Sequence, residues 1–264
     1  MNLKTDENLR AFVRKRGRAA VALSGGVDSS ALIAFCAAEL GGENCLAITA
    51  APPYAVPKEI SEAEKLCEKL GVRLIKIPIE KIPDEIKFNP PERCYLCKRA
   101  IFSKIISEAK GRGFSSVFDG TNADDLSDYR PGMKALKELG VESPFLACGL
   151  GKAQIREIAR CLMLDSADSP ASACLLTRLE HGAEIKIETL KKIAALEEIL
   201  REKYSRQVRA RVIGENVFIE CPAENFSKVV SGAAEISEAA KALGFRRCAL
   251  DLSGYKQGSM NAKK

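Results

Sequence analysis

The sequence predicts an α/β fold, in which a parallel sheet flanked by helices is followed by a smaller C-terminal α+β domain. The first prediction rests on short apolar runs that alternate with amphipathic helical segments, as in consecutive βαβ units. The second rests on two neighbouring strand-like runs late in the chain that are separated only by a turn. We therefore expect domains over residues 1–168 and 169–264.

The expected elements of the first domain follow one another regularly. An amphipathic helix over 5–17 precedes a fully buried strand over 18–24, and a helix follows the next loop. Further strands are expected over 44–50, 72–79 and 115–121, and further helices over 57–70, 98–110 and 151–163. Because strands alternate with helices, the sheet should be parallel.

The second half of the sequence changes character. An irregular stretch over 165–185 leads to a long amphipathic helix over 186–203. Two strands within 207–222 should turn at 214–216, and two short helices and a last strand over 246–254 should follow. This order predicts a small α+β domain.

Composition excludes several classes of protein. No run of the 264 residues reaches the roughly 18 to 20 apolar residues of a membrane span, and the charged N-terminus carries no secretion signal. Ten cysteines in such a chain indicate thiols, redox groups or metal ligands in the cytoplasm rather than disulfides. A net charge of +6 favours a small anionic ligand, and nucleic acid is not the expected partner.

A glycine-containing loop joins the first strand to the following helix. It consists of Ser24, Gly25, Gly26, Val27, Asp28, Ser29 and Ser30. Glycines permit close approach of the backbone, and the free N–H groups and dipole of a helix N-terminus attract phosphate. An aspartate there would repel phosphate unless it bound a cation, so Asp28 indicates Mg²⁺. The alternative is a simple turn in which Asp28 caps the helix.

The loop SGGVDSS resembles the PP-loop of the ATP pyrophosphatase group and differs from the Walker pattern. The resemblance implies a PP-loop/adenine nucleotide alpha hydrolase-like fold. It also implies that ATP is split into an adenylated acceptor and pyrophosphate. Asn122, Asp124 and Asp125 follow a strand and resemble the second nucleotide and metal segment of that group. Lys152 is expected to stabilise the leaving pyrophosphate, with helix-surface charge as the alternative.

The cysteines divide into two sets. Five lie in apolar surroundings and are expected to pack in the core: Cys36, Cys45, Cys67, Cys148 and Cys161. Cys94 and Cys97 form a C-x-x-C before the helix over 98–110, and Cys174 lies in the irregular stretch. Three thiols fit a [4Fe-4S] cluster with one open iron, whereas a structural zinc would need Cys221 or Cys248 as a fourth ligand.

Several segments together resemble the LarE family of sulfur insertases along essentially the whole chain: SGGVDSS, PERCYLCK, TNADDLSDYRPG, ACLLTRLEHGAEI, VRARV and LDLSGYKQGSMN. The resemblance implies adenylation of a carboxylate of pyridinium-3,5-biscarboxylic acid mononucleotide and its conversion to a thiocarboxylate, during synthesis of the nickel-pincer nucleotide cofactor. Cys174 matches the reactive cysteine of the family.

The family has two branches. In one, the reactive cysteine gives up its own sulfur and becomes dehydroalanine; in the other, three cysteines carry a [4Fe-4S] cluster that relays sulfide. Cys94, Cys97 and Cys174 place this chain nearer the second branch, so a sulfide source is an expected partner. The resemblance also implies substrate phosphate binding by Arg178, Arg209 and Arg211, a metal or substrate contact at Glu220, and a homo-oligomer.

Two rival interpretations remain open. Some PP-loop enzymes thiolate tRNA through a three-cysteine cluster, but the mild charge and the lack of an appended RNA-binding domain count against this. The second rival is a non-catalytic sensor that binds ATP without releasing pyrophosphate. Asp28, Lys152, Asp124 and Asp125 argue against it, because a sensor has no leaving group to stabilise.

Overall fold

The computed structural model describes residues 3–52, 54–55, 57–127, 131–168 and 174–256. The chain forms two compact units. Unit 1 comprises Met1–Pro83 and Glu92–Ala171, and unit 2 comprises Asp84–Pro91 and Ser172–Lys264. The domain boundary expected after residue 168 lies next to 169–173, which are outside the described residues.

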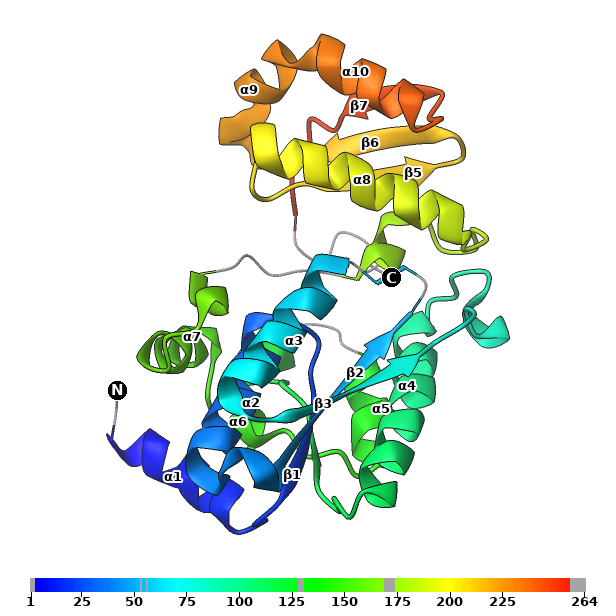
Figure 1. Cartoon of the computed structure of the whole chain (residues 1–264). Helices are drawn as coiled ribbons and strands as arrows, with labels where there is room; N and C mark the ends of the chain where they lie inside the picture. Colours follow the sequence, from blue (N-terminus) through cyan, green and yellow to red (C-terminus); the bar gives the residue numbers. More distant parts are fainter. Residues whose placement is uncertain (1–2, 53, 56, 128–130, 169–173, 257–264) are drawn as a thin grey trace. The chain divides into compact units, whose positions relative to one another are not determined.

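Unit 1 is built on a four-stranded parallel sheet in the order β3-β2-β1-β4 (Figure 1). Its strands are β1 (Ala19–Ala22), β2 (Cys45–Ala51), β3 (Arg73–Pro78) and β4 (Val117–Phe118). Its helices are α1 (Leu3–Arg14), α2 (Val27–Leu40), α3 (Pro57–Leu70), α4 (Arg93–Gly111), α5 (Gly132–Glu138), α6 (Pro144–Ala147) and α7 (Lys152–Cys161). The predicted parallel α/β fold is confirmed.

Helices cover both faces of this sheet, because alternate residues of a strand point to opposite sides. Val21 of β1 belongs to a core that also contains residues of α1, α2, α3 and α7. Ala20, its neighbour in the chain, belongs to a second core with Phe102 and Ile105 of α4 and Leu136 of α5. β1 is therefore apolar throughout, and β2 is apolar except for Thr49, as the hydrophobic runs predicted.

The strand order reverses at β1, which pairs with β2 on one side and with β4 on the other. The loop after β1 leads to α2, whereas the loop after β4 leads towards α5. Open α/β sheets bind ligands at the carboxyl ends of strands where the order reverses. The fold therefore brings the SGGVDSS loop and the segment after β4 to the expected position of a ligand site.

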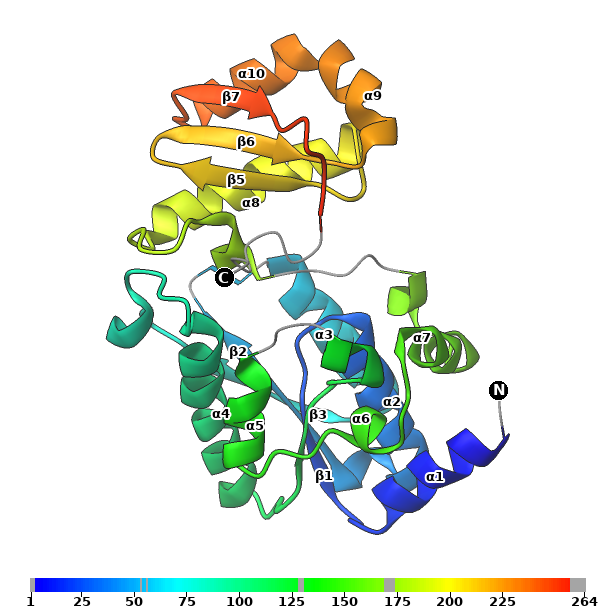
Figure 2. The same cartoon turned by 180° about the vertical axis from the view of Figure 1, so that it is seen from behind.

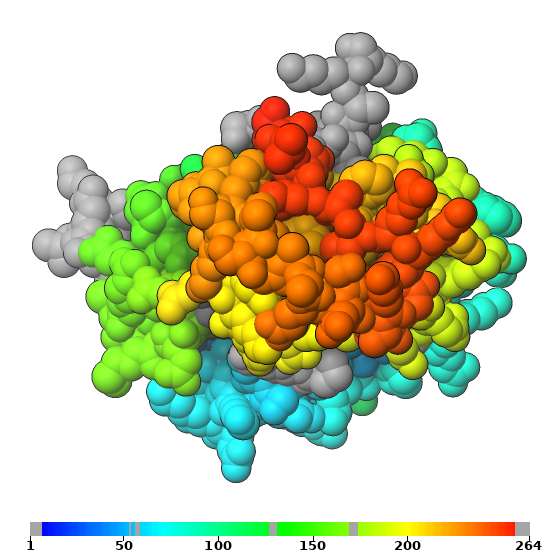
Figure 3. All heavy atoms as spheres, turned by 90° about the horizontal axis from the view of Figure 1, so that it is seen from above, coloured from blue at the N-terminus to red at the C-terminus, as the bar shows by residue number. Residues whose placement is uncertain are grey.

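Unit 2 contains a small mixed sheet in the order β5-β6-β7 (Figure 2). Its elements are α8 (Ile187–Lys203), β5 (Arg209–Ile213), β6 (Asn216–Glu220), α9 (Phe226–Ser231), α10 (Ala233–Ala242) and β7 (Arg247–Leu250). β5 and β6 are antiparallel and β7 is parallel to β6, as a C-terminal α+β domain requires. Figure 3 presents the side of unit 2 formed by α9, α10 and β7.

A short segment from the first third of the chain belongs to unit 2. Asp84–Pro91 packs there through Asn89, which is buried and whose side-chain amide donates to the carbonyls of Leu179 (2.9 Å) and Glu180 (2.7 Å). The backbone N–H of Ile185 donates to the carbonyl of Lys87 (2.8 Å). No pattern in the sequence predicted that this segment belongs to unit 2.

Two further features differ from the sequence-based expectations. α4 begins at Arg93, so the C-x-x-C lies inside the first turn of the helix and not before it. Pro90 and Pro91 stop a helix from extending further back, but RCYLCK itself contains no helix breaker. The short helices α5 and α6 were not predicted. Within the described residues, no helix is both long and apolar enough to cross a bilayer.

Candidate active site

The loop between β1 and α2 has a backbone that only small residues allow. Gly25 adopts φ = +81°, and a Cβ atom there would lie 3.1 Å from the Cβ and carbonyl oxygen of Glu59. Gly26 occupies the N-cap position of α2 without a side-chain cap. Free N–H groups at the start of α2 are therefore left for a ligand, as in other anion-binding helix N-termini.

The serines of the loop have different environments. The Ser29 hydroxyl is buried, donates to the carbonyl of Gly26 (3.1 Å) and accepts from the backbone N–H of Ser24 (3.1 Å). Ser30 is also buried, and Val27 lies in the core beneath the loop. The Ser24 side chain is exposed and is 3.0 Å from the Ser29 hydroxyl. Ser29 therefore shapes the loop, whereas Ser24 faces the ligand side.

The segment after β4 lies directly against this loop. A Cβ atom on Gly120 would be 2.9 Å from the backbone nitrogen of Ser29 and 3.1 Å from the Cβ of Asp28. Only glycine permits such an approach. Gly120 lies between the buried carboxylate of Asp119 and Thr121, and the sequence analysis had not singled out either Gly120 or Asp119.

Asp28 and Lys152 form an ion pair across this edge of unit 1. The Nζ atom of Lys152 is 2.5 Å from Oδ2 of Asp28, and both side chains are partly exposed. The backbone N–H of Lys152 donates to Oδ2 of Asp124 (2.7 Å). The structure thus brings together three of the predicted site residues, Asp28, Asp124 and Lys152.

Asn122 and Asp125 are buried and shape the turn that presents Asp124. The Asp125 carboxylate accepts from the backbone N–H of Asn122 (3.0 Å), and Oδ1 of Asn122 accepts from the N–H of Asp124 (3.1 Å). The N–H of Ala123 donates to the carbonyl of Leu150, which ties this turn to the start of α7. Three segments distant in sequence therefore meet at one site.

One oxygen of Asp28 fits the expected magnesium ion. Its Oδ1 atom is buried and has no hydrogen-bond partner among the described residues, whereas Oδ2 pairs with Lys152. A buried carboxylate oxygen without a partner is costly unless a ligand satisfies it. Mg²⁺ is commonly held by one or two carboxylates together with phosphate oxygens and water, so this single oxygen is a suitable ligand.

The C-x-x-C turn of α4 lies at the same edge of unit 1. Cys94 is exposed and Cys97 half-buried, and Nζ of the next residue, Lys98, is 3.9 Å from Oδ2 of Asp119. Asp119 also accepts hydrogen bonds from Thr121 and Ser143, each at 2.5 Å. Since Asp119 precedes Gly120, the thiol-bearing turn is connected to the phosphate loop through two consecutive residues.

The other cysteines are divided by burial. Cys36, Cys45 and Cys67 are buried as expected, and burial raises the pKa of Cys45 to about 12 and that of Cys67 to about 11. Cys148 is half-buried. The expectation for Cys161 is wrong, because the last turn of α7 exposes it. Helical spacing alone did not show which face of α7 this residue occupies.

The metal ligands predicted from cysteine pattern are distributed over both units. Cys94 and Cys97 belong to unit 1 and Cys174 to unit 2. The part of the chain that the structure describes contains no group of three or more His, Cys, Asp or Glu side chains arranged to hold a metal. Cys94 and Cys97 are three residues apart on one helical turn, which suits two thiolate ligands of a cluster. The proposed fourth zinc ligands differ in burial, with Cys221 buried and Cys248 half-buried.

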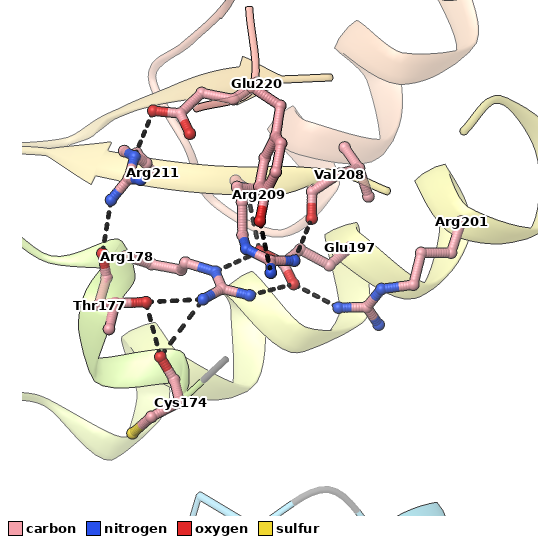
Figure 4. A network of polar contacts seen from close by, with 11 residues as sticks. Cys174, Thr177, Arg178, Glu197, Arg201, Val208, Arg209, Arg211 and Glu220 are labelled. Carbon is pink, nitrogen blue, oxygen red and sulfur yellow. Dashed lines mark hydrogen bonds and ion pairs between the residues drawn. The ribbon is translucent and has the colours of Figure 1, made fainter. Parts of the chain in front are cut away.

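Unit 2 holds Cys174 through a network of arginines and glutamates (Figure 4). The guanidinium of Arg178 donates to both carboxylate oxygens of Glu197, at 2.6 and 3.0 Å, and both side chains are almost completely buried. Another nitrogen of Arg178 donates to the carbonyl of Cys174 (3.3 Å). Glu197 also accepts from Arg201 and from the backbone N–H of Ala210 (2.9 Å).

Thr177 connects the turn of Cys174 to two of the arginines. Its hydroxyl donates to the carbonyl of Cys174 (2.8 Å) and accepts from Arg178 (2.7 Å). Its own carbonyl accepts from Arg211 (2.7 Å), and Arg211 also pairs with Oε1 of Glu220. Cys174 itself is exposed at the start of the 3₁₀ turn Leu175–Arg178. A rigid, mostly buried frame therefore presents an exposed cysteine.

Arg209 differs from the other two predicted substrate-binding arginines. It is 7% exposed and donates to the carbonyl of Val208 (2.9 Å), but no carboxylate among the described residues pairs with it. Burial, followed by repulsion from Arg178, lowers its pKa. Glu197 opposes this effect without accepting a hydrogen bond from Arg209, so part of the cost of burying the cation remains.

Glu220 is held less completely than its burial requires. Oε1 pairs with Arg211, whereas the buried Oε2 has no partner among the described residues. In the described part of the chain, Glu220 belongs to no group of three or more potential metal ligands. Glu220 thus retains one acceptor for a substrate donor or a metal ion.

Comparison with known proteins shows which families and relatives this chain resembles. The NAD synthase family matches residues 3–92, which contain the phosphate loop. Uncharacterized proteins of Synechocystis sp. and Methanocaldococcus jannaschii are each 36% identical to this chain. The first match covers 97% of this chain and 96% of the relative, and the second covers 96% of both.

A third relative is the pyridinium-3,5-bisthiocarboxylic acid mononucleotide synthase of Lactiplantibacillus plantarum, which is 30% identical over 96% of this chain and 92% of its own length. This chain belongs to the LarE family. It is therefore an ATP-dependent sulfurtransferase with a PP-loop domain of the NAD synthase type. As a LarE family member, it carries Cys174, the phosphate loop and the arginines on two separate structural units.

Proposed function

We propose that this enzyme adenylates a carboxylate of pyridinium-3,5-biscarboxylic acid mononucleotide and converts it to a thiocarboxylate in nickel-pincer nucleotide synthesis. The observation that carries the proposal is the frame of unit 2, in which Arg178 and Thr177 hold the carbonyl of an exposed Cys174. The similarity to the synthase of L. plantarum, over nearly the full length of both chains, supports the choice of substrate.

The adenylation step belongs to unit 1. The N–H groups at the start of α2 would bind the β- and γ-phosphates of ATP, with Gly25 and Gly26 allowing close approach. Asp28 would hold Mg²⁺, which neutralises phosphate charge when it is bound. A carboxylate oxygen of the substrate attacks the α-phosphorus and the α–β bridging bond breaks. Lys152 then breaks its ion pair with Asp28 and pairs with the leaving pyrophosphate.

Sulfur transfer follows on the acyl adenylate. A sulfur nucleophile attacks the acyl carbon, the carbon–oxygen bond to AMP breaks, and AMP leaves with the bonding electrons. If Cys174 is the nucleophile, cleavage of its Cβ–Sγ bond with loss of its Cα proton gives the thiocarboxylate and dehydroalanine. If sulfide is the nucleophile, Cys174 remains intact. Two carboxylates per substrate require two rounds.

We favour the branch in which Cys94, Cys97 and Cys174 hold a [4Fe-4S] cluster, which would supply an open iron for sulfide. The accessibility of these thiols supports this choice: Cys94 and Cys174 are exposed and Cys97 is half-buried. Cys161 is exposed as well. The other six cysteines are buried or half-buried, and burial raises the pKa of each of these thiols: Cys36, Cys45, Cys67, Cys148, Cys221 and Cys248. A single-use Cys174 without a cluster is the alternative.

The arginines have separate tasks in this proposal. Arg209, which pairs with no carboxylate among the described residues, binds the phosphate of the substrate, whereas Arg178 and Arg211 mainly position the Cys174 turn. Glu220 retains a free acceptor for the substrate or a metal ion. A sulfide source and a homo-oligomer complete the proposal. None of the ten cysteines, all of which lie in the described part of the chain, forms a disulfide, which agrees with the proposed cytoplasmic location.

The first test compares Cys174→Ala with Cys161→Ala, a matched variant of another exposed cysteine. Pyrophosphate release and thiocarboxylate formation are measured with ATP and the pyridinium mononucleotide. Cys174→Ala should keep pyrophosphate release and lose the sulfur product, and Cys161→Ala should keep both. Thiocarboxylate formation by Cys174→Ala would refute the assignment. Stimulation of pyrophosphate release by tRNA, but not by the mononucleotide, would support tRNA thiolation instead.

A second test separates the two sulfur sources. Iron and acid-labile sulfide are measured in anaerobically purified and reconstituted protein. The cluster branch predicts about four irons per chain, lost in Cys94→Ala, Cys97→Ala and Cys174→Ala but retained in Cys161→Ala. If wild type takes up no iron, mass spectrometry after turnover should find dehydroalanine at position 174.

A further inference from the structure

The chain after β7 continues alongside the end of β6. The N–H of Asp251 donates to the carbonyl of Ile219 (2.9 Å), and the N–H of Tyr255 donates to the carbonyl of Cys221 (2.9 Å). Gly254 makes the turn between them with φ = +70°, a conformation that glycine adopts without strain. Two backbone hydrogen bonds therefore fix Tyr255 in unit 2.

Tyr255 lies against Arg209. The centre of its ring is 5.2 Å from the guanidinium carbon, and its hydroxyl oxygen is 3.5 Å from a guanidinium nitrogen. This guanidinium also donates to the carbonyl of Val208 (2.9 Å). Arg209 is thus held by a neutral ring, a neutral hydroxyl and a carbonyl, with no carboxylate among the described residues.

The neutral contacts of the buried Arg209 guanidinium do not neutralise its positive charge. Because burial and Arg178 lower the pKa of Arg209, the folded protein disfavours its charged form. Glu197 raises the pKa of Arg209 in turn, but this carboxylate already pairs with Arg178 and Arg201. Since arginine stays protonated in proteins, an additional anion would reduce the cost of burying Arg209. The neutral phenol adds no competing negative charge and can donate its own proton to an anion.

We propose that Tyr255 is a substrate-contacting residue, which forms with Arg209 a subsite for a phosphate monoester. The guanidinium fork binds two phosphate oxygens and the phenol donates to a third, while the ring keeps the guanidinium in position. The inference rests on the proposed function, because the pyridinium mononucleotide supplies the phosphate. The inference assigns substrate binding to the turn over 251–255 as well as to the arginines.

The matched variants are Tyr255→Phe and Tyr204→Phe. Tyr204 is also in unit 2, where its hydroxyl donates to Glu235 (2.6 Å), away from the arginine network. Tyr255→Phe keeps the ring over Arg209 and removes only the donor. A lost hydrogen bond to a charged group should raise the KM for the mononucleotide about tenfold and change kcat less than twofold. Tyr204→Phe should leave both constants unchanged, and the KM for ATP should stay the same in both variants.

A binding measurement keeps the inference testable if turnover is absent. Inorganic phosphate should raise the Tm of the wild type, and this shift should be smaller in Tyr255→Phe and smaller still in Arg209→Met, which keeps only the phosphate loop of unit 1. Loss of turnover with a retained phosphate shift would contradict the proposed function but not the subsite. A wild-type KM together with a wild-type phosphate shift in Tyr255→Phe would overturn the role of Tyr255.

Discussion

The phosphate loop of unit 1 and the arginine network of unit 2 both favour an anion, but by different means. In the loop, backbone N–H groups and a helix dipole form the site, and its hydrogen bonds join residues as close as Ser24 and Ser29. In the network, whole side-chain charges are buried, and its contacts join residues as distant as Arg209 and Tyr255.

The two regions also expose their ion pairs differently. Asp28 and Lys152 are 25% and 32% exposed, whereas Arg178 and Glu197 are 1% and 0% exposed. A partly exposed pair can exchange partners at little cost, which suits the proposed role of Lys152 in leaving Asp28 to bind pyrophosphate. A buried pair is rigid, because separating it leaves a desolvated charge. The partly exposed pair of unit 1 is therefore suited to exchange ions, and the buried pair of unit 2 is suited to keep Cys174 in a fixed position.

The largest effect should come from Asp28→Asn. Removing the charge takes away the carboxylate proposed to hold Mg²⁺ and frees Lys152, so pyrophosphate release should fall about 10³-fold, or about 4 kcal/mol. Asp168→Asn is the control, because Asp168 pairs with Arg160 on the surface of the same unit. An Asp28→Asn rate within tenfold of the wild type would show that the carboxylate does not serve the metal.

Glu197→Gln should mainly affect stability. The variant leaves Arg178 buried beside a neutral amide, and the free energy of unfolding measured in urea should fall by about 3–5 kcal/mol. Glu142→Gln breaks the partly exposed pair with Arg16 in unit 1 and should cost about 1 kcal/mol or less. Equal losses in the two variants would contradict the contrast between the units.

Alkaline pH should weaken unit 1 through its buried thiols. Burial raises the folded-state pKa of Cys67 from 9.0 to about 11, so the folded state keeps this proton after the unfolded chain has lost it. The stabilisation is complete below about pH 9 and should fall by up to about 1.4 kcal/mol per pH unit towards pH 11. Urea unfolding of Cys67→Ala should show a shallower pH slope, whereas Cys161→Ala should match the wild type.

Thr177→Val tests the frame around Cys174 with the smallest change. The variant keeps the side-chain shape but removes the hydroxyl that joins the Cys174 carbonyl to Arg178. Thiocarboxylate formation should fall about tenfold, by the roughly 1–1.5 kcal/mol of one hydrogen bond, with pyrophosphate release unchanged. Thr177→Ser should restore the rate. A parallel loss of pyrophosphate release, or no rescue by serine, would remove Thr177 from this role.

The contrast also explains what the sequence could predict. Apolar runs and glycine turns are local signals, so β1, β2, β3, the α2 loop and the β5–β6 hairpin all follow from short windows. Asp28 and Lys152 could be singled out by their motifs, but the ion pair between them depends on how unit 1 folds.

Contacts between distant residues carry no such local signal. In the sequence, Arg178 and Arg209 are two arginines with the same charge. Among the described residues, only the fold shows that Arg178 pairs with a carboxylate and that Arg209 does not. The exposure of Cys161 and the start of α4 likewise depend on tertiary packing. The packing of Gly120 against Ser29 could have been suspected only from a glycine that directly follows a strand.

The segment Asp84–Pro91 has a consequence for how the protein is made. It leaves the ribosome long before Ser172–Lys264, yet it belongs to the same unit, with Ile86 and Asn89 fully buried there. Unit 2 cannot be completed until translation is nearly finished. A fragment beginning at Ser172 would lack the partner of the Leu179 and Glu180 carbonyls, so an excised unit 2 needs this octapeptide supplied separately or grafted onto it.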